Sequence, residues 1–182
     1  MKHPYTIGHG NRTINEFLEL LKKYCVDYVI DVRSKPYSKF NPHFNQDELG
    51  VTLREHGITY VFMGDNLGGR PKDLSCYTPE GKVDYDKVRL KPFFKEGIER
   101  IKTACSKKLS IALMCSEAKP CDCHRTKLIG EALSSLDIDL QHINERGKLK
   151  DQLTVMNELK TGIPEFDLFG TPLLSSSRKA YL

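Results

Sequence analysis

Short apolar runs alternate with amphipathic segments along most of this chain, and this alternation constrains the fold more than any other feature. The apolar or β-branched runs are residues 5–9, 26–32, 59–63, 109–114 and 139–143. Helical spacing of hydrophobic residues follows Asn45 or Asp47 and also occurs over 13–24, 91–105, 125–136 and 148–159. Strands that alternate with helices form a parallel sheet covered by helices. The sequence therefore predicts an α/β protein with a mostly parallel sheet of about five strands, in a Rossmann-like three-layer arrangement.

The length of 182 residues is suited to one domain with a short extension. We expect a single α/β domain over residues 1–160 and an irregular C-terminal tail over 161–182, because the alternation stops near Thr161. Residues 64–90 show no sustained period. A loop of that length in a compact domain is usually functional or mobile.

The composition is that of an ordinary soluble protein, with 39% hydrophobic and 29% charged residues. The net charge of +4 permits a small anionic ligand but does not by itself call for nucleic acid. No run approaches the roughly 18 apolar residues of a membrane span, and the first residues lack the apolar core of a signal peptide. We therefore expect a cytoplasmic protein with no membrane partner, whose six cysteines stay reduced and form no disulfide. The sequence does not predict the oligomeric state.

Polar residues follow the predicted strands, at the sheet edge where open α/β proteins bind ligands. Arginine binds phosphate or carboxylate through two parallel hydrogen bonds, and a helix N-terminus adds backbone donors. An alternative is that each arginine pairs with a nearby acid, such as Asp31 or Glu117. The candidate ligand-binding residues are His9, Asn11, Arg12, Asp31, Arg33, Arg70 and Arg125.

The stretch "LMCSEAKPCDCHR", residues 113–125, carries the candidate catalytic residues Cys115, Glu117 and His124. Cys115 stands where a strand meets a loop, and cationic neighbours there would lower the pKa of its thiol and make it nucleophilic. Glu117 and His124 would share the proton transfers. The alternatives are a buried, inert Cys115 and structural roles for the other two.

A metal site is a further alternative, because Cys115, Cys121, Cys123 and His124 would supply four soft ligands. However, Cys-x5-Cys-x-Cys-His is not a standard zinc spacing, and adjacent residues rarely bind one tetrahedral metal. The sequence therefore assigns no metal ligand and no cofactor.

Five motifs resemble the bacterial and archaeal family called domain of unknown function 488: "TIGHGNR", "DVRSKPYSKF", "YVFMGDNLGGR", "LMCSEAKPCDCHR" and "HI". The resemblance covers about residues 4–145. It implies a compact α/β domain, and it implies no reaction. The family pattern falls on Gly8, His9, Asn11, Arg12, Asp31, Arg33, Pro36, Gly68, Gly69, Arg70, Cys115, Glu117, Cys123, His124 and Arg125. The chain departs from it at Gly10, where serine is usual, at Lys39, where arginine is common, and at Cys121, which is extra.

Three functions stay open at this point. The first is an enzyme that binds a phosphate-bearing or nucleotide-like substrate at the carboxyl edge of the sheet. The second is a non-catalytic module for a nucleotide or nucleic acid. Within segment 33–44, it would use the aromatic and basic mix of Lys35, Tyr37, Lys39, Phe40 and Phe44, which is suited to stacking on unpaired bases. For that segment we favour the simpler interpretation that its aromatic side chains pack into the core. The third is a metal-dependent enzyme that uses Cys115, Glu117 and His124.

Overall fold

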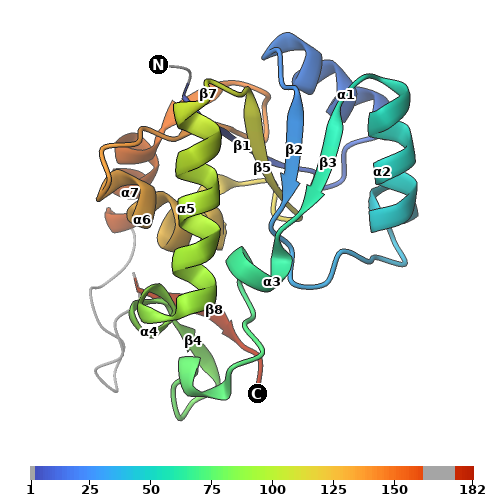
Figure 1. The fold of residues 1–182 in the computed structure, drawn as a ribbon. Coiled ribbons are helices and arrows are strands. Elements are labelled where there is room, and N and C mark those ends of the chain that lie inside the picture. The colour runs from blue at the N-terminus through green and yellow to red at the C-terminus, as the bar shows by residue number, and fades with distance from the viewer. Residues whose placement is uncertain (1–2, 162–174) are drawn as a thin grey trace.

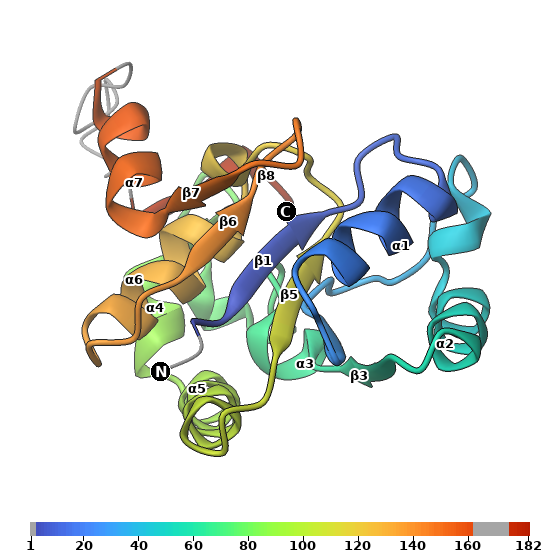
Figure 2. The ribbon, with the colours of Figure 1, turned by 90° about the horizontal axis from the view of Figure 1, so that it is seen from above.

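A computed structural model describes residues 3–161 and 175–182 of the chain. Its centre is a six-stranded sheet, shown in two views related by a 90° turn in Figures 1 and 2. The strands in spatial order are β3 (Thr59–Phe62), β2 (Tyr28–Asp31), β5 (Ile111–Cys115), β1 (Tyr5–Gly8), β6 (Gln141–Ile143) and β7 (Leu149–Asp151). The first five of these are mutually parallel, and β7 pairs antiparallel with β6. The predicted mostly parallel α/β sheet is confirmed.

The strand order differs from that of the Rossmann fold in one respect. In that fold the first two strands are adjacent, whereas here β5 lies between β1 and β2 and pairs with both. The predicted layers, a sheet with helices on both faces, are therefore present, but the Rossmann-like part of the prediction is not confirmed. As a consequence, the loops that leave β1, β2 and β5 all start from the middle of the same sheet edge.

Helices cover both faces of the sheet. The α-helices are α1 (Ile14–Lys23), α2 (Gln46–Glu55), α3 (Gly64–Leu67), α4 (Tyr85–Leu90), α5 (Pro92–Ser106), α6 (Glu131–Ser134) and α7 (Gln152–Lys160). The shorter turns are the 3-10 helices η1 (Pro42–Phe44), η2 (Leu74–Cys76) and η3 (Pro120–Asp122) and the π-helix η4 (Arg125–Gly130). Helices α1 and α2 pack on one face, and α3, α4, α5, η4 and α6 contribute to the core on the other.

The alternation of side chains along β5 shows how the two cores are divided. Ile111, Leu113 and Cys115 face the core beneath α5, whereas Ala112 and Met114 face the core beneath α1 and α2. All five side chains are buried, which explains why a continuous apolar run marks this strand in the sequence. Because the side-chain period is two, the same alternation places Cys115 on the face that η4 also covers.

Helix α1 illustrates how local sequence determines where an element begins. The Thr13 hydroxyl accepts a hydrogen bond from the Glu16 backbone N–H, and the Glu16 carboxylate accepts one from the Thr13 N–H. This capping box satisfies backbone donors that the first turn leaves free. Phe17, Leu18 and Leu21 then lie on one buried face, as their spacing predicts.

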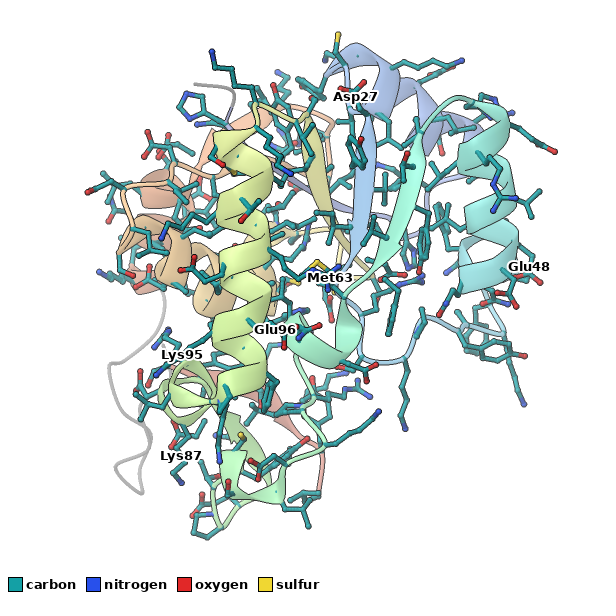
Figure 3. The ribbon with its side chains drawn as sticks, viewed as in Figure 1. Asp27, Glu48, Met63, Lys87, Lys95 and Glu96 are labelled. Carbon is teal, nitrogen blue, oxygen red and sulfur yellow. The ribbon has the colours of Figure 1, made fainter. Side chains whose placement is uncertain are left out.

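The segment from residue 64 to residue 90 is not one long loop. It contains α3, η2, β4 (Lys82–Asp84) and α4, which are too short to give a sustained period in the sequence. Several of its apolar residues are buried in the core next to α5, where Leu67, Val83 and Val88 are fully inaccessible, whereas Leu74 and Leu90 are exposed. Figure 3 marks Met63, also buried, where the chain leaves β3 for this segment.

The C-terminal residues return to the body of the protein. Strand β8 (Ser176–Ala180) pairs antiparallel with β4, although the sequence predicts only an irregular tail. Most of the remainder of that tail, residues 162–174, lies outside the described residues. Segment 148–159, predicted as helix throughout, begins instead with β7, and α7 starts after the capping residue Asp151. Among the described residues, no helix is long and apolar enough to cross a membrane.

Candidate functional site

A cavity of about 530 Å³ opens at the carboxyl ends of β1, β2 and β5. This is the edge at which parallel α/β sheets bind ligands. The cavity has the size of a pocket for a small molecule or a nucleotide. Seven of the predicted site residues line it: His9, Asn11, Arg33, Arg70, Cys115, Glu117 and His124. Arg12, Asp31 and Arg125 are not among the lining residues.

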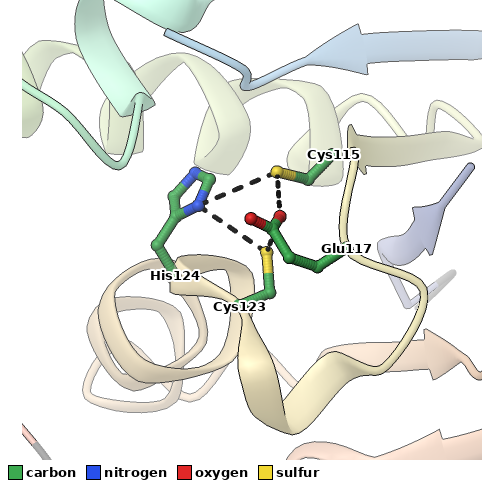
Figure 4. Close-up of side chains that lie close together, drawn as sticks. All are labelled: Cys115, Glu117, Cys123 and His124. Carbon is green, nitrogen blue, oxygen red and sulfur yellow. Dashed lines mark hydrogen bonds between the residues drawn. The ribbon is translucent and has the colours of Figure 1, made fainter. Parts of the chain in front are cut away.

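Four side chains with metal-binding chemistry lie close together (Figure 4), and three of them line this cavity. One ligand atom from each of Cys115, Glu117, Cys123 and His124 lies within 4.8 Å of the other three. The Glu117 Oε2 atom is 2.9 Å from the Cys115 Sγ and 3.3 Å from the Cys123 Sγ. The His124 Nδ1 is 3.9 Å from the first sulfur and 3.6 Å from the second. We refer to these four residues as the thiol cluster.

The backbone after β5 explains how four residues so close in sequence reach one point. Strand β5 ends at Cys115, and the chain then passes close over the end of β1 at Gly8. A Cβ at Gly8 would lie 1.8 Å from the Glu117 carbonyl oxygen, so this approach requires glycine. Pro120 then begins η3, and the chain returns to the cavity at Cys123.

Cys123 and His124 converge although they are neighbours in the sequence. Cys123 has extended backbone angles, whereas His124 is helical and precedes the π-helix η4. This change in conformation turns both side chains toward the same space. The sequence argument was that adjacent residues rarely bind one metal. It does not consider a pair in which one residue is extended and the next is helical.

The ring of His124 is fixed from both sides. Its Nε2 lies 3.2 Å from the carbonyl oxygen of Val32, which can only accept a hydrogen bond, so Nε2 carries a proton. In the neutral ring the Nδ1 lone pair then points toward the two sulfurs. Gly69 packs against the ring, and a Cβ there would lie 2.9 Å from Cγ and Nδ1.

Arg125 is a buried cation beneath the thiol cluster. Its side chain is 0% exposed, and it forms no ion pair with a carboxylate among the described residues. Instead its Nε lies 3.1 Å from the Cys123 Sγ, and its two terminal nitrogens contact the Glu117 carbonyl and the Thr6 hydroxyl. A buried guanidinium needs an anion beside it. The Cys123 sulfur is the group in position to be that anion.

The pKa shifts of the two thiols agree with this assignment. Burial raises the pKa of the Cys123 thiol, but the hydrogen bond with Cys115 and the charges of Arg125 and His124 outweigh burial and hold the pKa well below its ordinary value. For Cys115, the hydrogen bond with Cys123 and burial raise the pKa well above its ordinary value. The sequence predicts the opposite direction for Cys115, because it does not show that Arg125 lies against the other thiol. Cys123 is therefore the thiolate of the pair.

Three of the predicted arginines form hydrogen bonds or ion pairs with other residues of the protein. Arg33 forms a two-pronged ion pair with Asp31, at 2.6 Å for the closest atoms, and also donates to the Phe44 carbonyl. Arg12 donates to the carbonyl oxygens of Gly8 and Asn144 and so ties the ends of β1 and β6 together. Arg125 contacts Cys123. Arg33 thus shows the pairing with a nearby acid that the sequence offered as an alternative to ligand binding.

His9 and Arg70 also line the cavity. The His9 ring stacks on Phe44 with centroids 4.4 Å apart, and burial lowers the pKa of His9 to about 4, so the ring is neutral at pH 7. The exposed Arg70 guanidinium lies 4.1 Å from the centroid of the Tyr181 ring. Arg70 is thus presented to the cavity by the C-terminal residues.

Sequence reasoning did not assign several residues that line the cavity. These come mainly from segment 33–44 and from the C-terminal strand, namely Ser34, Lys35, Tyr37, Ser38, Asn41, Tyr85, Asp122, Arg178, Lys179 and Tyr181. Cys123 was considered only as a metal ligand, in an alternative that the sequence did not favour, and it was not among the predicted site residues. Hydrophobic periodicity carries no signal for the pairing of β8 with β4, which brings residues 178–181 to the cavity.

These features define an α/β protein with a cluster of two cysteines, a glutamate and a histidine at the carboxyl edge of its sheet. The family model described as "Domain of unknown function DUF488" matches residues 13–132, and the chain belongs to this family. No curated protein and no solved structure matches the chain.

Proposed function

We propose that this protein is a metal-dependent hydrolytic enzyme that acts on a phosphate-bearing substrate in the cavity above the thiol cluster. One observation carries the proposal. Four potential metal ligands lie within 4.8 Å of one another, and three of them, Cys115, Glu117 and His124, also line the cavity. A purely structural metal site is closed, whereas a catalytic site keeps an open position toward its substrate.

The spacing of the thiol cluster suits a tetrahedral zinc-type ion. Bond lengths of about 2.3 Å to sulfur and about 2.0 Å to nitrogen place tetrahedral ligand atoms about 3.5–3.8 Å apart. The two sulfur–nitrogen separations are 3.6 and 3.9 Å. The sulfur–oxygen separations of 2.9 and 3.3 Å are shorter. The buried residues Cys115, Cys123 and His124 are therefore assigned as ligands, and Glu117 as the carboxylate beside the open position.

The surroundings of the ligands favour metal binding as well. Histidine ligands commonly donate their other ring N–H to a carbonyl, as His124 does to Val32. Cysteine binds metal as thiolate, and Arg125 stabilises that form of Cys123. A bound ion would supply a Lewis acid and lower the pKa of a water molecule. Glu117 would accept the proton of the attacking water, because its side chain reaches both the cluster and the cavity.

Cations around the cavity suit an anionic substrate. Lys35, Arg70 and Lys179 line it and form no ion pair among the described residues. Arg178 also lines it and pairs with Asp122 at 3.0 Å. Unpaired cations around a cleft raise the local concentration of anions and so favour a phosphate group over a neutral substrate.

The test is hydrolysis of bis(p-nitrophenyl) phosphate and p-nitrophenyl phosphate by chelator-treated protein reloaded with zinc or manganese. We expect turnover that depends on the metal and falls by about 100-fold or more in Glu117→Gln, the usual contribution of a general base. Glu99→Gln, an exposed change on α5, is the matched control and should keep full activity. Equal hydrolysis by Glu117→Gln and the wild type at full metal occupancy would contradict the role of Glu117. No turnover of either probe by fully loaded protein would count against this substrate class.

A further inference from the structure

Segment 33–44 presents two aromatic side chains to solvent beside the cavity. Tyr37 is 67% exposed and Phe40 is 94% exposed, whereas Phe44 is buried in the core. The interpretation that the aromatic residues of this segment pack inward therefore holds for Phe44 and fails for the other two. Exposure of a phenylalanine to this degree has no role in stabilising the fold.

Hydrogen bonds hold this segment in a defined turn. The Ser38 hydroxyl accepts from the backbone N–H groups of Phe40 and Asn41, both at 3.2 Å. The Asn45 side chain accepts from the Ser38 N–H at 2.7 Å. Tyr37, Ser38 and Asn41 line the cavity, and Phe40 does not. Phe40 is thus displayed just outside the cavity, on a turn whose flanking residues face into it.

Positive charge flanks the exposed aromatic residues. Lys35 and Lys39 belong to the same segment and are exposed. The cavity lining also includes Arg178 and Lys179 from β8 and Arg70, which lies over the Tyr181 ring. Aromatic side chains that alternate with cations are the surface that single-stranded nucleic acids bind, since bases stack on the rings and phosphates pair with the cations.

We propose that the ligand of this site is a single-stranded nucleic acid, with one nucleotide in the cavity and its neighbour stacked on Phe40. The proposal rests on the proposed function in that both place a phosphate-bearing group in the same cavity. Phe40 distinguishes a strand from a free nucleotide. A mononucleotide would fill the cavity and leave Phe40 without a contact, whereas the next base of a strand reaches it. DNA and RNA share this chemistry, and the experiment distinguishes them.

The test is fluorescence anisotropy with labelled oligothymidylate and oligouridylate of about twelve nucleotides, with a duplex of the same length for comparison. We expect binding of at least one single strand and weaker binding of the duplex. If about four phosphates are contacted, the logarithm of affinity should fall with the logarithm of salt concentration with a slope near about −3. No saturable binding of either single strand at low salt would overturn the proposal, and so would tighter binding of the duplex.

Matched variants locate the interaction. Phe40→Ala should weaken strand binding by about 5-fold or more, as expected for the loss of one stacked base. It should leave the binding of thymidine monophosphate unchanged. The control Leu153→Ala removes another apolar side chain, 70% exposed on α7 at a separate pocket, and should have no effect. Equal losses for the strand and the mononucleotide in Phe40→Ala would contradict the assignment of Phe40 to the neighbouring base.

The cations are tested in the same assay. Lys35→Ala combined with Lys179→Ala should reduce the salt slope by about 1–1.5, because two phosphate contacts are lost. Lys107→Ala, at the end of α5 just before β5 begins, lies at the opposite edge of the sheet and should leave the slope unchanged. An unchanged slope in the double variant would overturn this role of the two lysines. All measurements are made with chelated and with metal-loaded protein, so that failure of the metal proposal stays separate from failure of this one.

Discussion

The His124 Nε2 atom lies 3.2 Å from the backbone oxygen of Val32, a residue 92 positions earlier in the chain. This hydrogen bond joins the end of β2 to the loop that follows β5. It requires a proton on Nε2, and so Nδ1 is the ring nitrogen that faces Cys115 and Cys123. Burial lowers the pKa of His124, but the charge of Cys123 outweighs burial and raises it. A metal ion at this position would therefore displace the Nδ1 proton.

Gly69 gives a way to disturb this orientation without removing a ligand. In Gly69→Ala the new Cβ would lie 2.9 Å from the His124 ring, so the ring must shift. We expect metal affinity to fall by about 10- to 100-fold, as for other changes next to ligands. Competition with a chromophoric chelator measures this loss.

Gly50→Ala is the control for that variant. A Cβ at Gly50 has only the Tyr60 ring within 4 Å, at 4.0 Å. Because Gly50 lies within α2, alanine should stabilise the helix by about 0.5–1 kcal/mol and leave metal affinity unchanged. Wild-type affinity in Gly69→Ala would show that the position of the His124 ring does not govern binding.

We expect that even lysine at position 125 destabilises the protein. The guanidinium contacts the Cys123 sulfur, the Glu117 carbonyl and the Thr6 hydroxyl, and an ammonium group cannot reach all three. We expect Arg125→Lys to cost about 3 kcal/mol, the scale for a broken buried charge pair, which lowers Tm by about 6–12 °C. Calorimetry of the metal-free protein measures the change. A Tm within about 2 °C of the wild type would show that the thiolate does not depend on this guanidinium.

His142 predicts how stability depends on pH. Its side chain is 0% exposed, lies 2.7 Å from the Thr6 hydroxyl and 2.8 Å from the Gln152 side chain, and burial lowers its pKa from 6.5 to about 4. Between these pH values the unfolded chain binds more protons than the folded protein. The contribution of His142 to the free energy of unfolding is therefore fully present above pH 6.5 and is lost as the pH falls toward 4. This contribution is about 3 kcal/mol at most.

Urea unfolding of the metal-free protein at several pH values tests this contribution. His142→Gln should reduce the loss of unfolding free energy on acidification by about 3 kcal/mol. His56→Gln, at the exposed end of α2, should leave that loss unchanged. An unchanged pH profile in His142→Gln would show that His142 titrates normally in the folded protein.

The strands and long helices are predictable from sequence because each buries one face or both. The apolar run 109–114 matches β5 within two residues, and Phe17, Leu18 and Leu21 define α1. Strands β4 and β7 are not predicted because they have three residues each, and β8 because its five residues are mostly polar and lack an alternating pattern. Only their pairing with distant residues makes them strands.

For the candidate site too, the sequence predicts some features and misses others. Polar residues at strand ends place Cys115, Glu117 and His124 at one edge, and they meet there. The sequence cannot show which partner satisfies each charge, so it treats Arg12, Arg33 and Arg125 alike. In the structure Arg12 donates to backbone carbonyls and Arg33 pairs with Asp31, whereas Arg125 lies beside Cys123.

All six cysteines are free thiols in the structure. We predict that denatured, chelator-treated protein prepared without reductant reacts with six equivalents of a thiol reagent. A count of four in freshly prepared protein would indicate a disulfide and would contradict this prediction. Peptide mapping would then identify the pair.

Metal stoichiometry in matched cysteine variants tests the central claim most directly. Cys121 is the control for Cys115 and Cys123, because it is close in sequence and lies outside the thiol cluster. Protein saturated with zinc and freed of excess metal is analysed by elemental mass spectrometry alongside its thermal unfolding. The account predicts about one zinc ion per chain in the wild type and in Cys121→Ser, and loss of the ion in Cys115→Ser and Cys123→Ser, both still folded. Cys123→Ser should also unfold at a lower temperature, because Arg125 loses its anion. Zinc retained at the same occupancy in both cluster variants, or lost in Cys121→Ser alone, would contradict it.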